Sequence, residues 1–160
     1  MTNNHQEYMQ VALKQAQMAF EADEVPVGAV IVHKGRIIAK AHNQIEMLRD
    51  PTAHAEMIAV TQATSTLGVK WLNDCILYAT IEPCSMCAGA LVLSRLKTIC
   101  YGAKDPKTGA CGSVLNIVTH PNLNHRIEVI DGICQEECSA IMTRFFKQKR
   151  FSASISFGNN

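Results

Sequence analysis

The sequence predicts an α/β fold: a three-layer α/β/α sandwich with a mixed, mostly parallel five-stranded sheet and helices on both faces. The first observation is that short apolar segments alternate with longer segments whose apolar residues recur at helical spacing. The second is a Lys-Gly turn between the first two apolar segments, which indicates a hairpin. The third is that proline and glycine stand where the helical segments begin and end.

The first half of the chain gives each element its own signal. Residues 5–22 carry apolar side chains at helical spacing, which predicts an amphipathic helix. Residues 27–33 are typical of a buried strand, and a turn then leads to a second strand at 36–42. Asp50-Pro51 favours a helix start, since proline is tolerated in a first turn, so we expect a helix from about 52 to 67. Gly68 ends it.

The second half continues the alternation of strands and helices. The remaining strands are expected at 75–81, 98–103 and 126–132. The remaining helices are expected from Pro83 to about Arg95 and over about 134–149. The order of elements favours a sheet covered on both faces.

The composition indicates one globular domain. The chain has 160 residues, 48% hydrophobic and 18% charged, and this balance excludes a disordered chain. We expect residues 1–150 to form the domain and residues 151–160 to form a tail that need not be ordered. The net charge of +1 does not by itself indicate nucleic-acid binding, which needs a local basic patch.

The first residues, the apolar runs and the cysteines indicate the cellular compartment of the protein. The first residues lack the regions of a secretion signal, and no apolar run approaches the roughly 20 residues that a membrane helix needs. Seven cysteines are an odd number without such a signal, so we expect reduced thiols. These features predict a cytoplasmic protein with no membrane partner.

Cys84 and Cys87, in "EPCSMC", stand three residues apart at an expected helix start. This spacing places both sulfur atoms on one side of a helical turn, and the positive end of the helix favours thiolate. With the imidazole of His54 they make three ligands for Zn²⁺. A zinc ion with three protein ligands keeps a fourth position for water, as catalytic sites do, whereas a structural site needs four.

Glu56 follows His54 by two positions in "PTAHAEMIAV". Residues two apart on a regular helix point to nearly opposite sides, so both can face one zinc ion only at the first turn, where the entering chain redirects the histidine. A carboxylate beside the metal, without ligating it, suits a proton carrier.

Either motif alone has ordinary explanations. A single His-x-Glu pair is a weak signal, and a single Cys-x-x-Cys motif serves thiol redox chemistry as well as zinc. Their combination, with a strand between two helix starts, is the signature of zinc-dependent nucleobase deaminases. Redox chemistry would leave the His-x-Glu pair unexplained.

The resemblance extends beyond this signature over roughly residues 7–150. Matching segments follow one another as "EVPVGAV", "HNQ", "DPTAHAE", "EPCSMCAGA", "YGAKDPKTGACGS" and "HPNLNHR". In these the chain resembles the bacterial tRNA-specific adenosine deaminases. The resemblance implies hydrolysis of adenosine to inosine at the wobble position of an anticodon, typically in an arginine tRNA. It also implies one Zn²⁺ per subunit, a homodimer, an anticodon stem-loop as partner and no nucleotide cofactor.

Carried over by position, the resemblance implies roles for single residues. His54, Cys84 and Cys87 match the zinc ligands, and Glu56 matches the proton carrier. The residues that it places around the substrate are Asn43, Val27, Gly28 and Asp105, and the final helix adds Phe145, Phe146 and Lys149 as an RNA-binding rim. Ordinary alternatives are turn residues for Asn43 and Asp105 and a buried strand for Val27-Gly28. On the final helix the alternatives are a core position for one phenylalanine and a solvated face for the charges.

Two other functions remain open at this point. A deaminase of free bases or nucleosides, acting on guanine or cytosine, would use the same zinc chemistry without needing the "KTGACGS" and "HPNLNHR" segments. A zinc or RNA-binding module without catalysis would have no use for Glu56.

Overall fold

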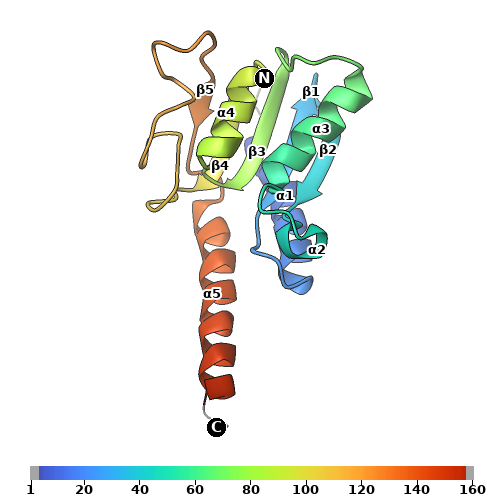
Figure 1. The fold of residues 1–160 in the computed structure, drawn as a ribbon. Coiled ribbons are helices and arrows are strands. Elements are labelled where there is room, and N and C mark those ends of the chain that lie inside the picture. The colour runs from blue at the N-terminus through green and yellow to red at the C-terminus, as the bar shows by residue number, and fades with distance from the viewer. Residues whose placement is uncertain (1–3, 158–160) are drawn as a thin grey trace.

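The computed structural model describes residues 4–157 and contains the expected five-stranded mixed sheet, in the order β2-β1-β3-β4-β5 (Figure 1). The strands are β1 (Gly28–His33), β2 (Arg36–His42), β3 (Cys75–Ile81), β4 (Thr98–Ala103) and β5 (Glu128–Ile130). β1 pairs antiparallel with β2 and β3, while β3, β4 and β5 pair in parallel. Four strands therefore run in one direction and β1 runs in the other.

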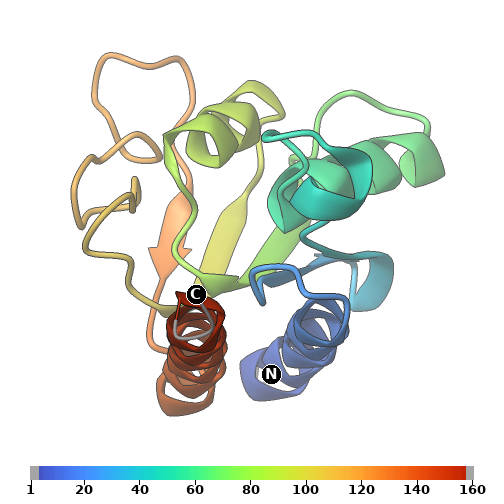
Figure 2. The same cartoon turned by 60° about the horizontal axis from the view of Figure 1, so that its bottom comes forward.

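Helices cover both faces of this sheet, as expected. They are α1 (His5–Glu21), α2 (Ile45–Leu48), α3 (Ala55–Leu67), α4 (Ser85–Leu93) and α5 (Gln135–Phe157). α3 and α4 lie on one face, and α1 and α5 lie side by side on the other (Figure 2). None of the helices within residues 4–157 combines the length and apolarity needed to cross a membrane.

The strands bury both faces because their side chains alternate. On β1, Ala29 and Ile31 belong to the core under α3 and α4, whereas Val30 and Val32 belong to the core under α1. Gly28 explains how closely α1 approaches the sheet. A Cβ atom at Gly28 would lie 1.9 Å from the carbonyl oxygen of Ala12, so no larger residue fits there.

The structure corrects several expected boundaries. α3 begins at Ala55 rather than near 52, because the Asp50 carboxylate accepts hydrogen bonds from the N–H and hydroxyl of Thr52 and turns the chain first. The short helix α2 was not expected. β1 and β5 are shorter than predicted, and α4 is shorter at both ends.

The end of the chain also differs from expectation. α5 was expected to end near 149, with a tail at 151–160, but the helix continues to Phe157 and projects beyond the body of the domain (Figure 1). "FSASISF" contains no proline or glycine to stop it. Residues 158–160 lie outside the described part of the chain, so the predicted flexibility of the tail stays a prediction.

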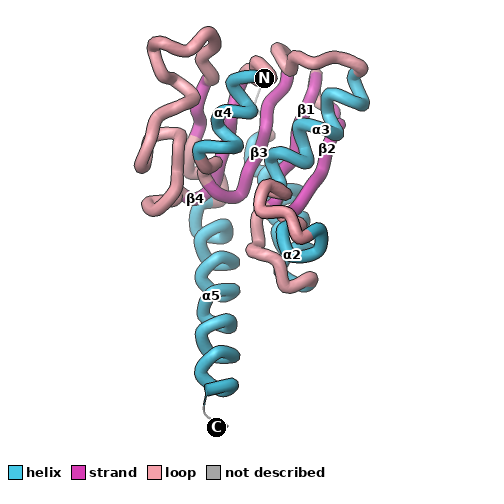
Figure 3. Tube along the Cα trace, in the orientation of Figure 1, coloured by secondary structure: helices cyan, strands magenta, loops and turns pink. Residues whose placement is uncertain are grey.

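One edge of the sheet gathers the segments that form the site. The carboxyl ends of β2, β3 and β4 open there, together with the start of β1. Residues 104–127, between β4 and β5, form a long irregular loop beside this edge (Figure 3). Ligands bind at such strand ends in open α/β sheets.

Candidate active site

A cavity of about 710 Å³ opens at this edge of the sheet. Its walls come from the segment before β1, the segment after β2 with the start of α2, the segment before α3, the segment between β3 and α4, the loop after β4, and α5. The lining residues include Val25, Val27, Asn43, Ile45, His54, Glu56, Glu82, Cys84, Lys104, Asp105, Lys107, Thr108, Met142, Phe146 and Arg150.

Three metal-ligating side chains meet beside the cavity. The Nδ1 atom of His54 lies 3.7 Å from the Sγ atom of Cys84 and 3.6 Å from that of Cys87. Two helix starts cause this arrangement. His54 and Cys84 are the N-cap residues of α3 and α4, each with extended backbone, which frees their side chains from the helical direction. Cys87 follows in the first turn of α4 and is fully buried.

These distances fit a zinc ion. Zinc lies about 2.3 Å from sulfur and about 2.0–2.1 Å from imidazole nitrogen, so tetrahedral geometry requires about 3.6 Å between the two ligand atoms. His54, Cys84 and Cys87 form a set of three, with no fourth histidine, cysteine or acidic ligand joining it among the described residues. Three ligands of these types suit a catalytic zinc ion, which keeps its fourth coordination position for water.

Hydrogen bonds lower the pKa of the Cys84 thiol and so favour its thiolate form. Hydrogen bonds from Cys87 and His54 lower the pKa of Cys84 to about 4. The pKa of Cys87 is raised, mainly by its hydrogen bond to Cys84 and to a smaller extent by burial. The pKa of His54 is raised, mainly by its hydrogen bond to Cys84. The three side chains are thus linked by hydrogen bonds, and a metal ion held by them would displace their protons.

Glu56 lies one residue inside α3 and is only 3% exposed. Its Oε1 atom is buried without a hydrogen-bond partner within residues 4–157. Burial raises the pKa of this carboxyl group above its usual value. A buried acceptor without a partner is costly, so an ordered water or substrate group in the cavity is its natural partner. Such a carboxyl group can both take and deliver a proton.

Asn43 follows β2 and is buried. Its Oδ1 atom accepts a hydrogen bond of 2.8 Å from the N–H of Ala55, the first residue of α3. This bond satisfies one of the free N–H groups at the helix start. The Nδ2 group is left to donate to a ligand in the cavity, so Asn43 both orients α3 and lines the pocket.

The remaining predicted site residues fall into two groups. Val27, Asp105 and Phe146 line the cavity, and Phe146 is 42% exposed. The Asp105 carboxylate is used within its own turn, where it accepts from the N–H groups of Lys107 and Thr108 and from the Thr108 hydroxyl. This is the turn role that its local sequence favours.

The structure places Gly28, Phe145 and Lys149 outside the cavity lining. Gly28 lies beneath α1, as described above. Phe145 is buried in edge-to-face contact with Phe20 on α1. Lys149 pairs with Asp23 at 2.6 Å and lies over the Phe145 ring.

Sequence reasoning missed Glu82 and the lysines of the loop after β4. Glu82 is 1% exposed and lines the cavity, as do Lys104 and Lys107. A signal for Glu82 was present, because an acidic residue directly follows the buried strand β3 and precedes the Pro-Cys pair. Nothing local distinguishes the two lysines from other surface lysines.

Known proteins resemble this chain over most of its length. Residues 3–150 match the family of MafB19-like deaminases. The tRNA-specific adenosine deaminase of Aquifex aeolicus (strain VF5) is 50% identical over 143 residues, which are 89% of this chain and 94% of the relative. The tRNA-specific adenosine deaminase of Bacillus subtilis (strain 168) is 46% identical over 143 residues, 89% of each chain.

Solved structures of deaminases also resemble this chain. A structure from a study of A-to-I editing by tRNA:A34 deaminases at the wobble position matches with a TM-score of 0.82 and 41% identity. That match covers 84% of this chain and 98% of the other. A guanine deaminase from Bacillus subtilis matches with a TM-score of 0.60 and 40% identity, over 65% of this chain and 66% of the other.

Proposed function

We propose that this chain, which belongs to the family of tRNA-specific adenosine deaminases, hydrolyses adenosine to inosine at the wobble position of a tRNA anticodon. Its substrate is proposed to be an arginine tRNA, as the family resemblance implies. One observation supports a hydrolytic deamination: the Oε1 atom of Glu56 is buried beside the ligand set His54, Cys84 and Cys87 and has no hydrogen-bond partner in the described part of the chain.

The cofactor is proposed to be one Zn²⁺ per subunit, held by the His54 Nδ1 atom and the two sulfur atoms. A zinc ion there lowers the pKa of a bound water molecule, so that hydroxide forms near neutral pH. Residues of this chain would transfer the protons and hold the base.

Glu56 moves the protons of the reaction. It takes a proton from the attacking water and delivers it to the purine ring nitrogen, while the water oxygen bonds to the ring carbon that carries the amino group. Glu56 then takes the proton of the newly attached hydroxyl group and carries it to the amine. The carbon–nitrogen bond breaks as the carbonyl of inosine forms, and ammonia leaves. The raised pKa of this carboxyl group favours the protonated form that must donate. Asn43 is placed to hold the base by its Nδ2 group.

The rim of the cavity suits RNA rather than a free base. Lys107 and Arg150 line the cavity and can contact phosphate groups, whereas the nearby Lys104 pairs with Asp131. Phe146 presents an exposed ring at the same opening, on which a neighbouring base can stack. These residues support an anticodon stem-loop as the partner.

The second candidate is deamination of free guanine, favoured by the likeness to the guanine deaminase of Bacillus subtilis. A free base carries no phosphate, so it would leave the cationic rim without a role. A zinc or RNA-binding module without catalysis is disfavoured, because it gives no use to the unpaired Glu56 oxygen.

The proposed assembly is a homodimer in the cytoplasm. All seven cysteines are free thiols, which suits a reducing compartment.

The surface that supports a dimer lies where α3 and α4 end, because apolar side chains are exposed together there. Leu93 is 81% exposed, and Arg95 stacks on the nearby Trp71 ring at 4.0 Å. Light scattering of the purified protein tests the dimer directly.

The reaction is tested by incubating the zinc-loaded protein with an arginine-tRNA anticodon stem-loop that carries adenosine at the wobble position. After digestion, mass spectrometry should find inosine at that position. Matched incubations with free guanine and cytidine should give no product. Product from guanine, with none from the stem-loop, would replace the first candidate with the second.

A further inference from the structure

Glu82 is a second buried carboxylate beside the metal-ligand set, and the reaction described above does not use it. It directly follows β3 and precedes Cys84 by two residues. No lysine, arginine or histidine within residues 4–157 pairs with it. A buried carboxylate without a cation needs strong hydrogen-bond donors.

One loop supplies all of those donors. The Oε1 atom of Glu82 accepts from the N–H of Asp105 at 3.1 Å and from the hydroxyl of Ser113. The Oε2 atom accepts from the N–H groups of Cys111 at 3.0 Å and Ser113 at 3.1 Å. The carboxylate therefore holds both ends of the segment 105–113, the first part of the long irregular loop.

The packing leaves the carboxylate and the loop little freedom. A Cβ atom at Gly109 would lie 2.4 Å from the Cδ atom of Glu82 and 2.5 Å from the carbonyl oxygen of Asp105. The N–H of Ala110 also bonds to the carbonyl of Pro83 at 2.9 Å. The loop is thus tied to the segment that carries Cys84.

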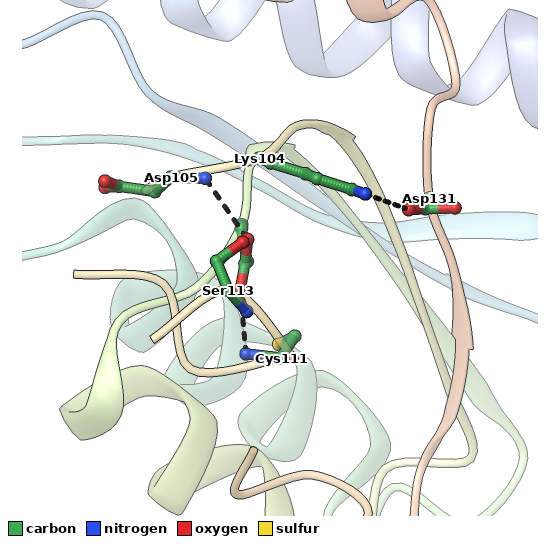
Figure 4. Close-up of polar contacts among 6 residues, drawn as sticks. Lys104, Asp105, Cys111, Ser113 and Asp131 are labelled. Carbon is green, nitrogen blue, oxygen red and sulfur yellow. Dashed lines mark hydrogen bonds and ion pairs between the residues drawn. The ribbon is translucent and has the colours of Figure 1, made fainter. Parts of the chain in front are cut away.

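This loop is also a wall of the substrate cavity. Residues Lys104 to Thr108 line the cavity, and the metal-ligating Cys84 lines it as well. Figure 4 shows that Lys104 and Asp105 point in opposite directions, with Lys104 paired to Asp131 at 3.7 Å. The position of the wall relative to the metal ligands therefore depends on the Glu82 contacts.

We propose that Glu82 is a positioning residue, which sets substrate affinity by holding the 105–113 wall at a fixed place relative to the metal ligands. This role rests on the proposed function, because the substrate is the RNA named there. Glu82 touches neither the reacting atoms nor, in this proposal, the metal.

The test is Glu82→Gln, which keeps the size of the side chain but replaces one acceptor with an N–H₂ group facing N–H donors. We expect unchanged zinc content and a kcat within about threefold of the wild type. The KM for the stem-loop should rise by about tenfold or more, since small misplacements at a binding wall are costly. An unchanged KM, or loss of zinc, would overturn the proposal.

Hydrogen exchange supplies a readout without substrate. In Glu82→Gln the amides of Asp105, Cys111 and Ser113 should exchange faster, while those of β3 should not. Slow exchange at all three would contradict the proposal. This readout holds even if the wild-type protein makes no inosine, an outcome that would contradict only the proposed reaction.

Ser113→Ala is the milder variant and carries the test if Glu82→Gln does not fold. It removes the hydroxyl donor and leaves three N–H donors in place. We expect a rise in KM in the same direction, of about two- to threefold, with zinc retained. The proposal would also be contradicted if Ser113→Ala had the KM of the wild type and its loop amides exchanged no faster.

Discussion

Glu56 and Glu82 are both buried carboxylates beside the same metal-ligand set, and they differ in how their oxygen atoms are satisfied. Glu82 accepts four hydrogen bonds from one loop. Glu56 has an oxygen with no partner among the described residues. The first arrangement fixes structure, whereas the second leaves an acceptor for water and substrate.

This difference indicates how two identical side chains acquire separate roles. The oxygen atoms of Glu82 are occupied by donors from one loop, so this side chain holds the loop in place. A desolvated carboxyl group with a free oxygen has a raised pKa and can change its protonation state during a reaction. The predictions below test this separation by removing other groups around the two residues.

The largest effect is expected for Cys84→Ser, which removes a metal ligand rather than a carboxylate. Zinc content should fall from one per chain to near zero, and inosine formation should fall below detection, because three ligands are needed to hold the ion. Metal analysis together with the stem-loop assay measures both. A zinc-free, fully active variant would remove the basis for assigning the site to zinc chemistry.

An intermediate effect is expected for Asn43→Ala. The N–H of Ala55 would lose its buried partner, which should lower the free energy of unfolding by about 1–3 kcal/mol. The loss of the Nδ2 donor should also lower kcat/KM for the stem-loop by about tenfold or more. Thermal unfolding and steady-state kinetics measure the two effects.

Asn43→Asp separates those two effects and serves as the matched control. It keeps an oxygen that can accept from the Ala55 N–H, but it lacks the donor. We expect stability near that of the wild type with the lowered kcat/KM retained. A normal kcat/KM in Asn43→Asp would limit Asn43 to the structural role.

The smallest effect is expected for Lys149→Ala. Its pair with Asp23 is solvent-exposed, with side-chain exposures of 46% and 77%, so the loss should cost less than about 1 kcal/mol. The KM for the stem-loop should stay within about twofold. A tenfold rise in KM would instead restore Lys149 as an RNA contact, as the sequence resemblance suggested.

The fold was predictable from the sequence where periodicity and turn residues agree. The hairpin around Lys34-Gly35 and the end of α3 at Gly68 are examples, and both glycines adopt the left-handed backbone that their positions require. Boundaries set by side-chain hydrogen bonds were missed. The turn made by Asp50 with Thr52 delays the start of α3, and no propensity indicates it.

The candidate site was predictable to the extent that its chemistry depends on local spacing. His54 and Glu56 lie two apart at a helix start, and the cysteines lie three apart at the next one, so the ligand geometry follows from short segments. The role of Glu82 could not be predicted from a short segment, because its hydrogen-bond partners are 23 to 31 residues further along the chain. The contact of Lys149 with Asp23 was unpredictable for a similar reason, since it joins distant parts of the sequence. The role of Lys149 as an RNA contact stays a prediction.

The most direct test of the separation compares Glu56→Gln with Glu82→Gln in the same stem-loop assay, with zinc content measured for both. Glu56→Gln should retain one zinc per chain, bind the stem-loop normally and lose about 10³-fold in kcat, because it cannot carry a proton. Glu82→Gln should keep kcat and lose affinity. A Glu56→Gln variant that turns over at the wild-type rate, or one that loses its zinc, would contradict the assignment of Glu56 as the proton carrier.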